Sequence, residues 1–181
     1  MNAKIAVAEY TQEQHVQDTM NAEIVIADYT NKQHAQDIVF LLNHYAVDPA
    51  GGGVELDRYT RSNLTEELAK LPFAFSLICY VDRVAVGLAN CFTLFSTFQC
   101  KPVINIHDLI VVDRYRRQGI SQLLLNEVEQ IAKDKGACKI TLEVLEKNYA
   151  AKNSYGKFGF VKYELNPEYG NAIFLEKKLP W

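Results

Sequence analysis

Two arginines and a glycine stand between an apolar strand-like segment and an amphipathic helix, in the sequence VVDRYRRQGISQLLL. The first N–H groups of a helix have no partner within the helix and lie at the positive end of its dipole, so they can bind a phosphate. Gly119 would allow close approach of that group, and Arg116 and Arg117 would add positive charge. The junction therefore predicts an anion-binding site, with a tight turn and solvated arginines as the simpler alternative.

A second group of residues that could do chemistry follows in the segment LEVLEKNYAAKNSYGKFGF. Here a strand-like stretch leads to Asn148, to a short helical stretch with Ala151 and Tyr155, and then to Gly159 and Phe160. Asn is a preferred helix N-cap, and that role alone would explain Asn148. A phenol has a reference pKa of about 10 and stays protonated at neutral pH, so Tyr155 can donate a proton. A tyrosine packed on the core is the alternative.

Two titratable side chains, His107 and Asp108, interrupt the apolar strand VINIHDLIVV just before the arginine-rich junction. Strand alternation predicts that they point to opposite faces of the sheet. An imidazole can accept a proton near neutral pH, so His107 is the candidate base, directly or through a water. A role for His107 in a hydrogen-bond network is an equal alternative, and Asp108 is predicted to be structural.

Together, the two blocks resemble the GCN5-related N-acetyltransferase (GNAT) superfamily. Its phosphate loop reads R/Q-x-x-G-x-G/A, and the following block reads N-x-x-A-x-x-x-Y-x-x-x-G-F. The matching residues are Arg116, Gly119, Asn148, Ala151, Tyr155, Gly159 and Phe160. Ser121 replaces the usual Gly or Ala of the loop, and the resemblance covers residues 23–179 in element order.

The segment IHDLIVVDRYR is also similar to the strand-four block LEDFFVMSDYR of the polyamine and diamine acetyltransferases. In this comparison His107 stands where that branch has a Glu, and Asp108 matches its Asp.

The resemblance implies acetyl-CoA as the acetyl donor, direct transfer to an amine, and no metal. The diphosphate would lie on the loop amides, and the pantetheine arm would run beside strand four, whose backbone would polarise the thioester carbonyl. The implied cofactor-binding residues are Leu109, Ile110, Val111, Arg116, Arg117, Gln118, Gly119, Ile120, Ser121, Gln122, Asn148, Ala151 and Tyr155. Tyr155 would be the catalytic acid beside the sulfur of CoA.

The amine acceptor is the least defined part of this prediction. Acceptor specificity in the family usually resides in loops that correspond to HYAVDPAGGGVELDRYTRSNL and FSTFQCKP. The candidate residues in these loops are acidic or aromatic: Tyr45, Asp48, Glu55, Asp57, Tyr59 and Phe95. Such groups suit a cationic amine, whereas solvated surface carboxylates are the common alternative. A small amine, an amino acid and a protein amino group all stay open as acceptors.

Hydrophobic periodicity predicts a mixed α/β domain. The expected strands cover residues 23–29, 73–81, 84–95, 103–112, 139–146, 158–164 and 172–178, and the expected helices cover 31–47, 59–70, 119–136 and 148–157. Asp82 and Arg83 would form a two-residue hairpin turn. The resemblance adds a mostly antiparallel sheet of about seven strands, splayed between strands four and five and flanked by about four helices.

The composition fits one soluble domain, with 181 residues, 49% hydrophobic residues and a net charge of −3. A chain of this size buries about 70% of its unfolded surface. The slight acidity disfavours nucleic-acid binding, and neither a membrane span nor a signal peptide is apparent, so a cytoplasmic location is predicted. The four cysteines lack CxxC spacing and are expected to be free thiols.

Residues 1–19 and 20–38 form a tandem repeat that matches at 11 of 19 positions. The second copy continues into IVFLLNHYA, which completes an amphipathic helix, so the second copy is expected to supply the first strand of the domain. The predicted organisation is therefore a duplicated segment, residues 1–19, which is an extra strand or disordered, and an N-acetyltransferase domain, residues 20–181. Deletion of residues 1–19 should leave a folded, active protein.

These observations predict an acetyl-CoA-dependent N-acetyltransferase that acts on a primary amine. The alternative is a non-catalytic acyl-CoA-binding sensor or regulatory module, because Ser121 and His107 depart from the patterns of the family. A Rossmann or P-loop nucleotide enzyme is disfavoured, since neither glycine pattern follows a strand. A homodimer is expected from the resemblance alone.

Overall fold

The computed structural model describes residues 21–164, 166–170 and 172–179. Its elements in chain order are β1 (Ala22–Ile26), α1 (Lys32–Val47), η1 (Pro49–Gly51), α2 (Arg58–Ala69), β2 (Ala74–Val81), β3 (Val84–Ser96), β4 (Lys101–Val111), η2 (Asp113–Tyr115), α3 (Ile120–Asp134), β5 (Lys139–Leu142), α4 (Tyr149–Phe158) and η3 (Pro167–Tyr169). The first copy of the repeat, residues 1–19, and the predicted boundary at residue 20 lie outside the described residues.

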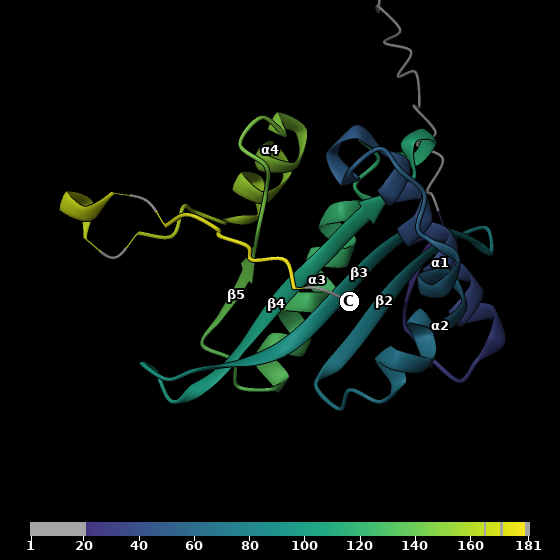
Figure 1. Cartoon of the computed structure of the whole chain (residues 1–181), viewed down its shortest axis with the longest axis horizontal. Coiled ribbons are helices and arrows are strands. Elements are labelled where there is room, and N and C mark those ends of the chain that lie inside the picture. Colours follow the sequence, from purple (N-terminus) through teal and green to yellow (C-terminus); the bar gives the residue numbers. More distant parts are fainter. Residues whose placement is uncertain (1–20, 165, 171, 180–181) are drawn as a thin grey trace, which may run out of the picture.

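The described elements form a mixed α/β fold around a five-stranded sheet with the order β1-β2-β3-β4-β5 (Figure 1). Neighbouring strands from β1 to β4 are antiparallel, and β5 runs parallel to β4. The predicted hairpin is confirmed, because Val81 pairs with Val84 and the two turn residues, Asp82 and Arg83, have φ of 49° and 66°. Positive φ at both central residues gives a turn whose twist suits a hairpin.

Helices cover both faces of the sheet. On one face, α3 buries Ile120, Leu124 and Val128 against β2, β3 and β4. On the other face, α1 buries Ile38 and Leu41, while α2 packs beside α1. Both α1 and α3 carry apolar residues at three-to-four spacing, which turns one continuous stripe of each helix toward the sheet.

The expected number of strands is wrong: the described residues form five strands, not seven. Residues 160–164 and 172–179 form no ladder, and their large apolar side chains are mostly exposed, for example Val161 at 88% and Leu175 at 79%. The alternating apolar pattern of these segments therefore has no opposing layer to pack against.

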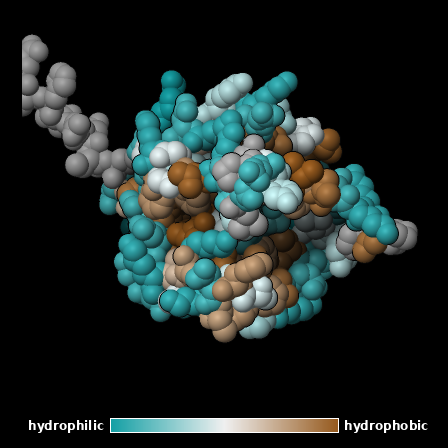
Figure 2. Space-filling model, turned by 90° about the vertical axis from the view of Figure 1, so that its left-hand side faces the viewer, coloured by the Kyte–Doolittle hydropathy of each residue, from teal (hydrophilic) through white to brown (hydrophobic). Residues whose placement is uncertain are grey.

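The end of the molecule that carries β5 and α4 presents apolar side chains at its surface (Figure 2). A cavity of about 320 Å³ lies here, lined by residues of α3, β5 and α4 that include Ala132, Ile140 and Phe158. No helix in the part of the chain described here is both long and apolar enough to cross a bilayer.

Candidate active site

The predicted anion site lies where β4 leads into α3. Two residues of this junction have left-handed backbone, Arg117 with φ 64° and Gly119 with φ 86°. No side chain caps α3, and among the described residues the amides of Arg117 to Ser121 have no hydrogen-bond acceptor. The next amide, that of Gln122, donates to the carbonyl oxygen of Gly119 at 2.9 Å. Five consecutive N–H groups at a helix start are therefore available to an anion.

A close helix-to-strand contact fixes the start of α3. A methyl group added at Gly87 of β3 would lie 2.9 Å from Cγ2 of Ile120 and 3.1 Å from Cδ1 of Leu124. Ile120 is the first residue of α3 and is almost fully buried. Because only glycine permits this approach, Gly87 determines how near the five amides lie to the sheet.

The edge of β4 that faces β5 is open beside this junction. β5 pairs only with Val103 to Ile106, and beyond that point β4 pairs, among the described strands, with β3 alone. The amide of Val112 donates to the carbonyl oxygen of Val86 in β3 at 2.9 Å. Since backbone groups alternate in direction along a strand, the N–H groups of Leu109 and Val111 point to the open edge. The backbone of Ile110, which was also predicted to contact the cofactor, faces β3.

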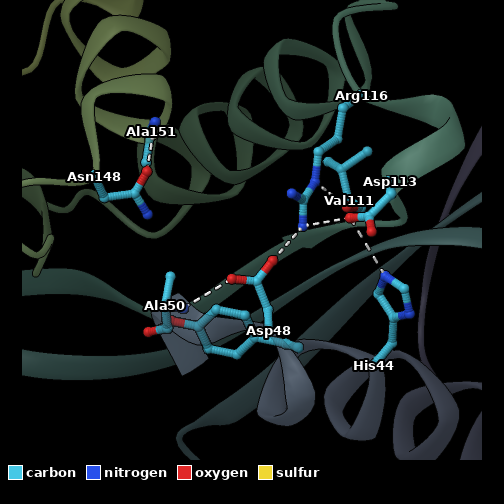
Figure 3. Close-up of polar contacts among 9 residues, drawn as sticks. His44, Asp48, Ala50, Val111, Asp113, Arg116, Asn148 and Ala151 are labelled. Carbon is cyan, nitrogen blue, oxygen red and sulfur yellow. Dashed lines mark hydrogen bonds and ion pairs between the residues drawn. The ribbon is translucent and has the colours of Figure 1, made fainter. Parts of the chain in front are cut away.

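Arg116 does not point into the row of free amides. Its Nε donates to the carbonyl oxygen of Val111 at 3.0 Å, and its Nη2 lies 3.0 Å from Oδ2 of Asp48 and 2.7 Å from Oδ1 of Asp113 (Figure 3). His44 Nε2 approaches the same Asp113 oxygen at 3.7 Å. The guanidinium of Arg116 thus lies between two carboxylates.

Asp48 organises the loop that follows α1. Its Oδ1 accepts a hydrogen bond from the amide of Ala50 at 2.8 Å, and its backbone carbonyl accepts from Gly51 and Gly53 at 2.8 and 3.1 Å. The hydrogen bonds from the Ala50 amide and from Arg116 hold the pKa of Asp48 below its usual range.

The start of α4 is held by Asn148, whose side chain accepts a hydrogen bond from the amide of Ala151 at 3.1 Å (Figure 3). At the other end Gly159 has φ 105°, its amide donates to Gly156, and the amide of Phe160 donates to Tyr155. This is the Schellman arrangement, in which the residue after the glycine packs on the residue five positions earlier. Phe160 accordingly lies edge-on to Tyr155, with 5.9 Å between ring centroids. The Gly-Phe pair of the motif therefore fixes the tyrosine ring.

Burial raises the pKa of Tyr155 to about 12, with a smaller contribution from nearby Tyr45. The phenol is therefore fully protonated at neutral pH, as a proton donor must be. Burial also raises the pKa of Tyr45, and the carboxylates of Asp108 and Asp48 raise it further. Tyr45 of α1 thus lies within electrostatic reach of both Tyr155 and Asp108.

Ser121, which departs from the motif, links the two helices of the site. Its Oγ lies 2.9 Å from Oγ of Ser154, the residue before Tyr155. The side-chain amide of Gln122 donates to the carbonyl oxygen and to Oγ of Ser154 at 3.1 and 2.9 Å. The side chain of Ser121 therefore joins the start of α3 to α4.

A β-bulge in β4 corrects the predicted orientation of His107 and Asp108. The pairing with β3 shifts between Asn90 and Cys91, which leaves His107 as an extra residue. Asp108 accepts a hydrogen bond from Asn90, and the ring of His107 packs edge-on to Phe92 with 5.5 Å between centroids. Asn90 and Phe92 share one face of β3, so His107 and Asp108 also share it. The prediction of opposite faces is wrong because a bulge interrupts strand alternation.

A chain of hydrogen bonds crosses the sheet to Asp108. Tyr29 OH lies 2.9 Å from Oγ of Ser76, Ser76 donates to Oδ1 of Asn90 at 2.7 Å, and Asn90 donates to Oδ2 of Asp108 at 2.9 Å. Because Ser76 donates its one hydroxyl proton to Asn90, Tyr29 must be the donor to Ser76. Every donor in the chain therefore points toward the carboxylate. Tyr29, Ser76 and Asn90 were not among the predicted site residues, although a lone Ser and a lone Asn within apolar strands were a signal.

Two of the six predicted acceptor residues, Tyr45 and Asp48, make contacts that join them to this site. In the part of the chain that the structure describes, no hydrogen bond or ion pair joins the other four to it: Glu55, Asp57, Tyr59 and Phe95. Asp57 caps α2, Glu55 pairs with Arg61 at 3.2 Å, and the residues Tyr59 and Phe95 are 72% and 61% exposed. Among the described residues, no group of three or more His, Cys, Asp or Glu side chains could hold a metal ion.

The site thus combines an open strand edge with a helix start that offers five free amides. This arrangement is expected of an N-acetyltransferase that takes a diphosphate-bearing donor. Residues 38–160 match the acetyltransferase (GNAT) family, and the chain belongs to this family, as its motifs predicted.

The chain is 26% identical, over 101 residues, to a putative [ribosomal protein bS18]-alanine N-acetyltransferase of Bacillus subtilis (strain 168), covering 56% of this chain and 63% of the relative. It is 32% identical over 80 residues to an uncharacterized N-acetyltransferase of Archaeoglobus fulgidus, covering 44% of this chain and 54% of the relative. The matched segments thus span less than two thirds of these curated relatives.

Among solved structures, the fold is similar to AAC(6')-Iy in complex with the bisubstrate analog CoA-S-monomethyl-acetylneamine. The TM-score is 0.69 at 19% identity, and the match covers 87% of this chain and 99% of that chain. The polyamine and diamine branch is not confirmed by these relatives and stays a prediction.

Proposed function

We propose that the protein is an acetyl-CoA-dependent N-acetyltransferase that transfers the acetyl group directly to a primary amine in a ternary complex. The observation that carries this proposal is the row of five free amides, from Arg117 to Ser121, next to the open edge of β4. The family supports the same reaction class.

The residues at the junction fit acetyl-CoA. The five amides and the side chain of Arg117 would hold the diphosphate. Leu109 and Val111 offer backbone groups at the open edge, to which the pantetheine arm can bond as an added strand. Asn148 and Ala151, at the start of α4, would line the other side of this arm. When bound, acetyl-CoA supplies the activated acetyl thioester.

Tyr155 serves as the proton donor for the departing sulfur. The amine nitrogen forms a bond to the acetyl carbon, the bond from that carbon to sulfur breaks, and the sulfur takes the phenolic proton of Tyr155. Because the pKa of Tyr155 is raised to about 12, the phenol carries its proton at neutral pH and has it available for the sulfur. The link between Ser154 and the start of α3 holds the donor in position.

His107 is the proposed proton acceptor for the amine, because the bulge places it on the face that also carries Asp108. Asp108 has one oxygen that accepts from Asn90, and Tyr45 lies nearby. A carboxylate beside a phenol suits a cationic amine before its proton is removed.

The acceptor is proposed to be a small amine, an amino acid or a protein amino group. The polyamine-like strand-four block favours the first. The similarity to a putative ribosomal-protein-alanine N-acetyltransferase favours the last. A cytoplasmic location and a homodimer are proposed from the sequence alone.

A thiol-release assay tests the function. The full chain is mixed with acetyl-CoA and, in turn, with spermidine, alanine, neamine and an alanine-terminated peptide. Amine-dependent release of CoA thiol is expected for at least one of them, and Tyr155→Phe should reduce it. If CoA binds and no amine stimulates thiol release, the chain is a sensor module and the enzymatic proposal is wrong.

A further inference from the structure

The motif places Arg116 among the phosphate ligands, but its contacts lead toward the other side of the groove. Three acceptors surround its guanidinium at 2.7 to 3.0 Å: the Val111 carbonyl and the carboxylates of Asp48 and Asp113. Figure 3 shows Arg116 between these two aspartates. A guanidinium that faces two carboxylates has its charge largely neutralised, which leaves little attraction for a diphosphate.

The partner that matters most is Asp48, because it belongs to a distant part of the chain. Arg116 follows β4, whereas Asp48 ends α1 and begins the loop of residues 48–53. Only 22% of the Asp48 side chain is exposed, so this ion pair is better shielded than a pair on the open surface. Arg116 is therefore the link between the loop after α1 and the end of β4.

This loop bears on the amine side of the groove. The hydroxyl of Tyr45 donates to the carbonyl oxygen of Ala50 at 3.4 Å, so the loop contacts the phenol that lies near Asp108 and Tyr155. If the loop moves, Tyr45 loses this contact. The free amides at the start of α3 are not part of the network, since no contact joins them to Asp48.

We propose that Arg116 is a positioning residue: it fastens loop 48–53 to the end of β4 and thereby places Tyr45 on the amine side, while Arg117 is the arginine that serves the diphosphate. This inference rests on the proposed function for its kinetic consequence, and it can be tested without any activity.

The test compares Arg116→Gln, Asp48→Asn and Arg117→Gln in the full chain by two measurements. Hydrogen exchange measures the exchange rates of three loop amides, those of Ala50, Gly51 and Gly53, which all donate to Asp48. Calorimetry reports the Kd of CoA itself. Far-UV circular dichroism checks that each variant is folded, and Arg116→Lys, which keeps the charge without the planar fork, serves as a conservative second variant.

In Arg116→Gln and Asp48→Asn, the loop amides should exchange about tenfold faster, since a broken charged contact of about 1.4 kcal/mol corresponds to that factor. The Kd of CoA should change less than about twofold. Arg117→Gln should give the reverse pattern, with unchanged exchange and a Kd raised about tenfold. Arg116→Lys should give intermediate exchange rates.

Asp48→Asn separates this role from phosphate binding because it removes one of the two carboxylates from the guanidinium. If Arg116 were a phosphate ligand, Asp48→Asn would tighten CoA binding, and Arg116→Gln would weaken it as much as Arg117→Gln does. Either result, or loop exchange that stays unchanged in Arg116→Gln, overturns the inference. Where an amine acceptor is found, Arg116→Gln should raise its KM about tenfold at an unchanged KM for acetyl-CoA. Absence of turnover in the wild type rejects only the proposed function.

Discussion

Tyr155→Phe is the substitution that tests the proposed chemistry most directly. It removes one oxygen and its proton, and no described residue loses a hydrogen bond, because the Tyr155 hydroxyl makes none within the described part of the chain. The ring keeps its edge-on contact with Phe160, and the Gly159 cap is unaffected. The melting temperature should therefore stay within about 2 °C of the wild type, which corresponds to at most about 1 kcal/mol for a domain of this size.

The expected loss in kcat follows from general acid catalysis. A positioned proton donor contributes about 10²-fold or more, and a 10²-fold loss in rate corresponds to about 2.7 kcal/mol of barrier. Because burial raises the pKa of Tyr155 to about 12, the wild type should keep the donor protonated up to about pH 10, where an unperturbed tyrosine would be half ionised. The pKa of Tyr155 is raised because burial penalises the charged phenolate, so the phenol retains its proton as the pH rises.

The assay is thiol release at saturating acetyl-CoA and amine, measured for the wild type, Tyr155→Phe and Tyr45→Phe from pH 7 to pH 10. Tyr45→Phe is the matched control, since it removes a nearby phenol whose one hydrogen bond among the described residues, to Ala50, is long at 3.4 Å. It should change the amine KM more than kcat. A kcat of Tyr155→Phe within twofold of the wild type, at an intact melting temperature, refutes the role of Tyr155 as the acid.

Other substitutions probe the remaining parts of the site. Gly119→Ala should raise the Kd of CoA about tenfold, because a φ of 86° costs a residue with a Cβ about 1–2 kcal/mol. Gly136→Ala is the control: it has φ 64° at the far end of α3 and carries the same strain. Calorimetry should show an unchanged Kd of CoA for Gly136→Ala. Asn90→Leu should raise the amine KM about tenfold in steady-state kinetics, because Asp108 loses the donor that orients it, while the KM for acetyl-CoA stays constant. His107→Ala should remove the acidic limb of the pH–rate profile; a surviving limb assigns the base to another group or to solvent.

Local signals in the sequence predicted the parts of the site that a few neighbouring residues determine. The strand, turn and helix around Gly119 depend on backbone preferences and apolar spacing within one short segment, so their pattern could be interpreted directly. The same holds for α4, where the Asn148 cap and the Gly159–Phe160 ending are local hydrogen-bond motifs. The Tyr155 ring was predictable because these motifs orient it.

Features that depend on distant residues could not be predicted in this way. The bulge at His107 arises from the register between β3 and β4, which no single strand encodes. The engagement of Arg116 by Asp48 joins residues that are far apart in the chain, so a motif confined to the loop assigns the arginine to the nearest anion instead. The two expected strands that the described residues do not form have the same cause. Alternation predicts a strand, but a segment becomes a strand only where a partner strand pairs with it.

The contact between Ser121 and Ser154 has a further consequence for the catalytic cycle. Under the proposed function, a shift of the first turn of α3 would reach the segment that carries Tyr155 through Ser154, which contacts the hydroxyl of Ser121 and the side-chain amide of Gln122. Binding of the proposed donor at the α3 amides and the position of Tyr155 would then be coupled. A chain with Gly at this position would lack the hydroxyl that couples them.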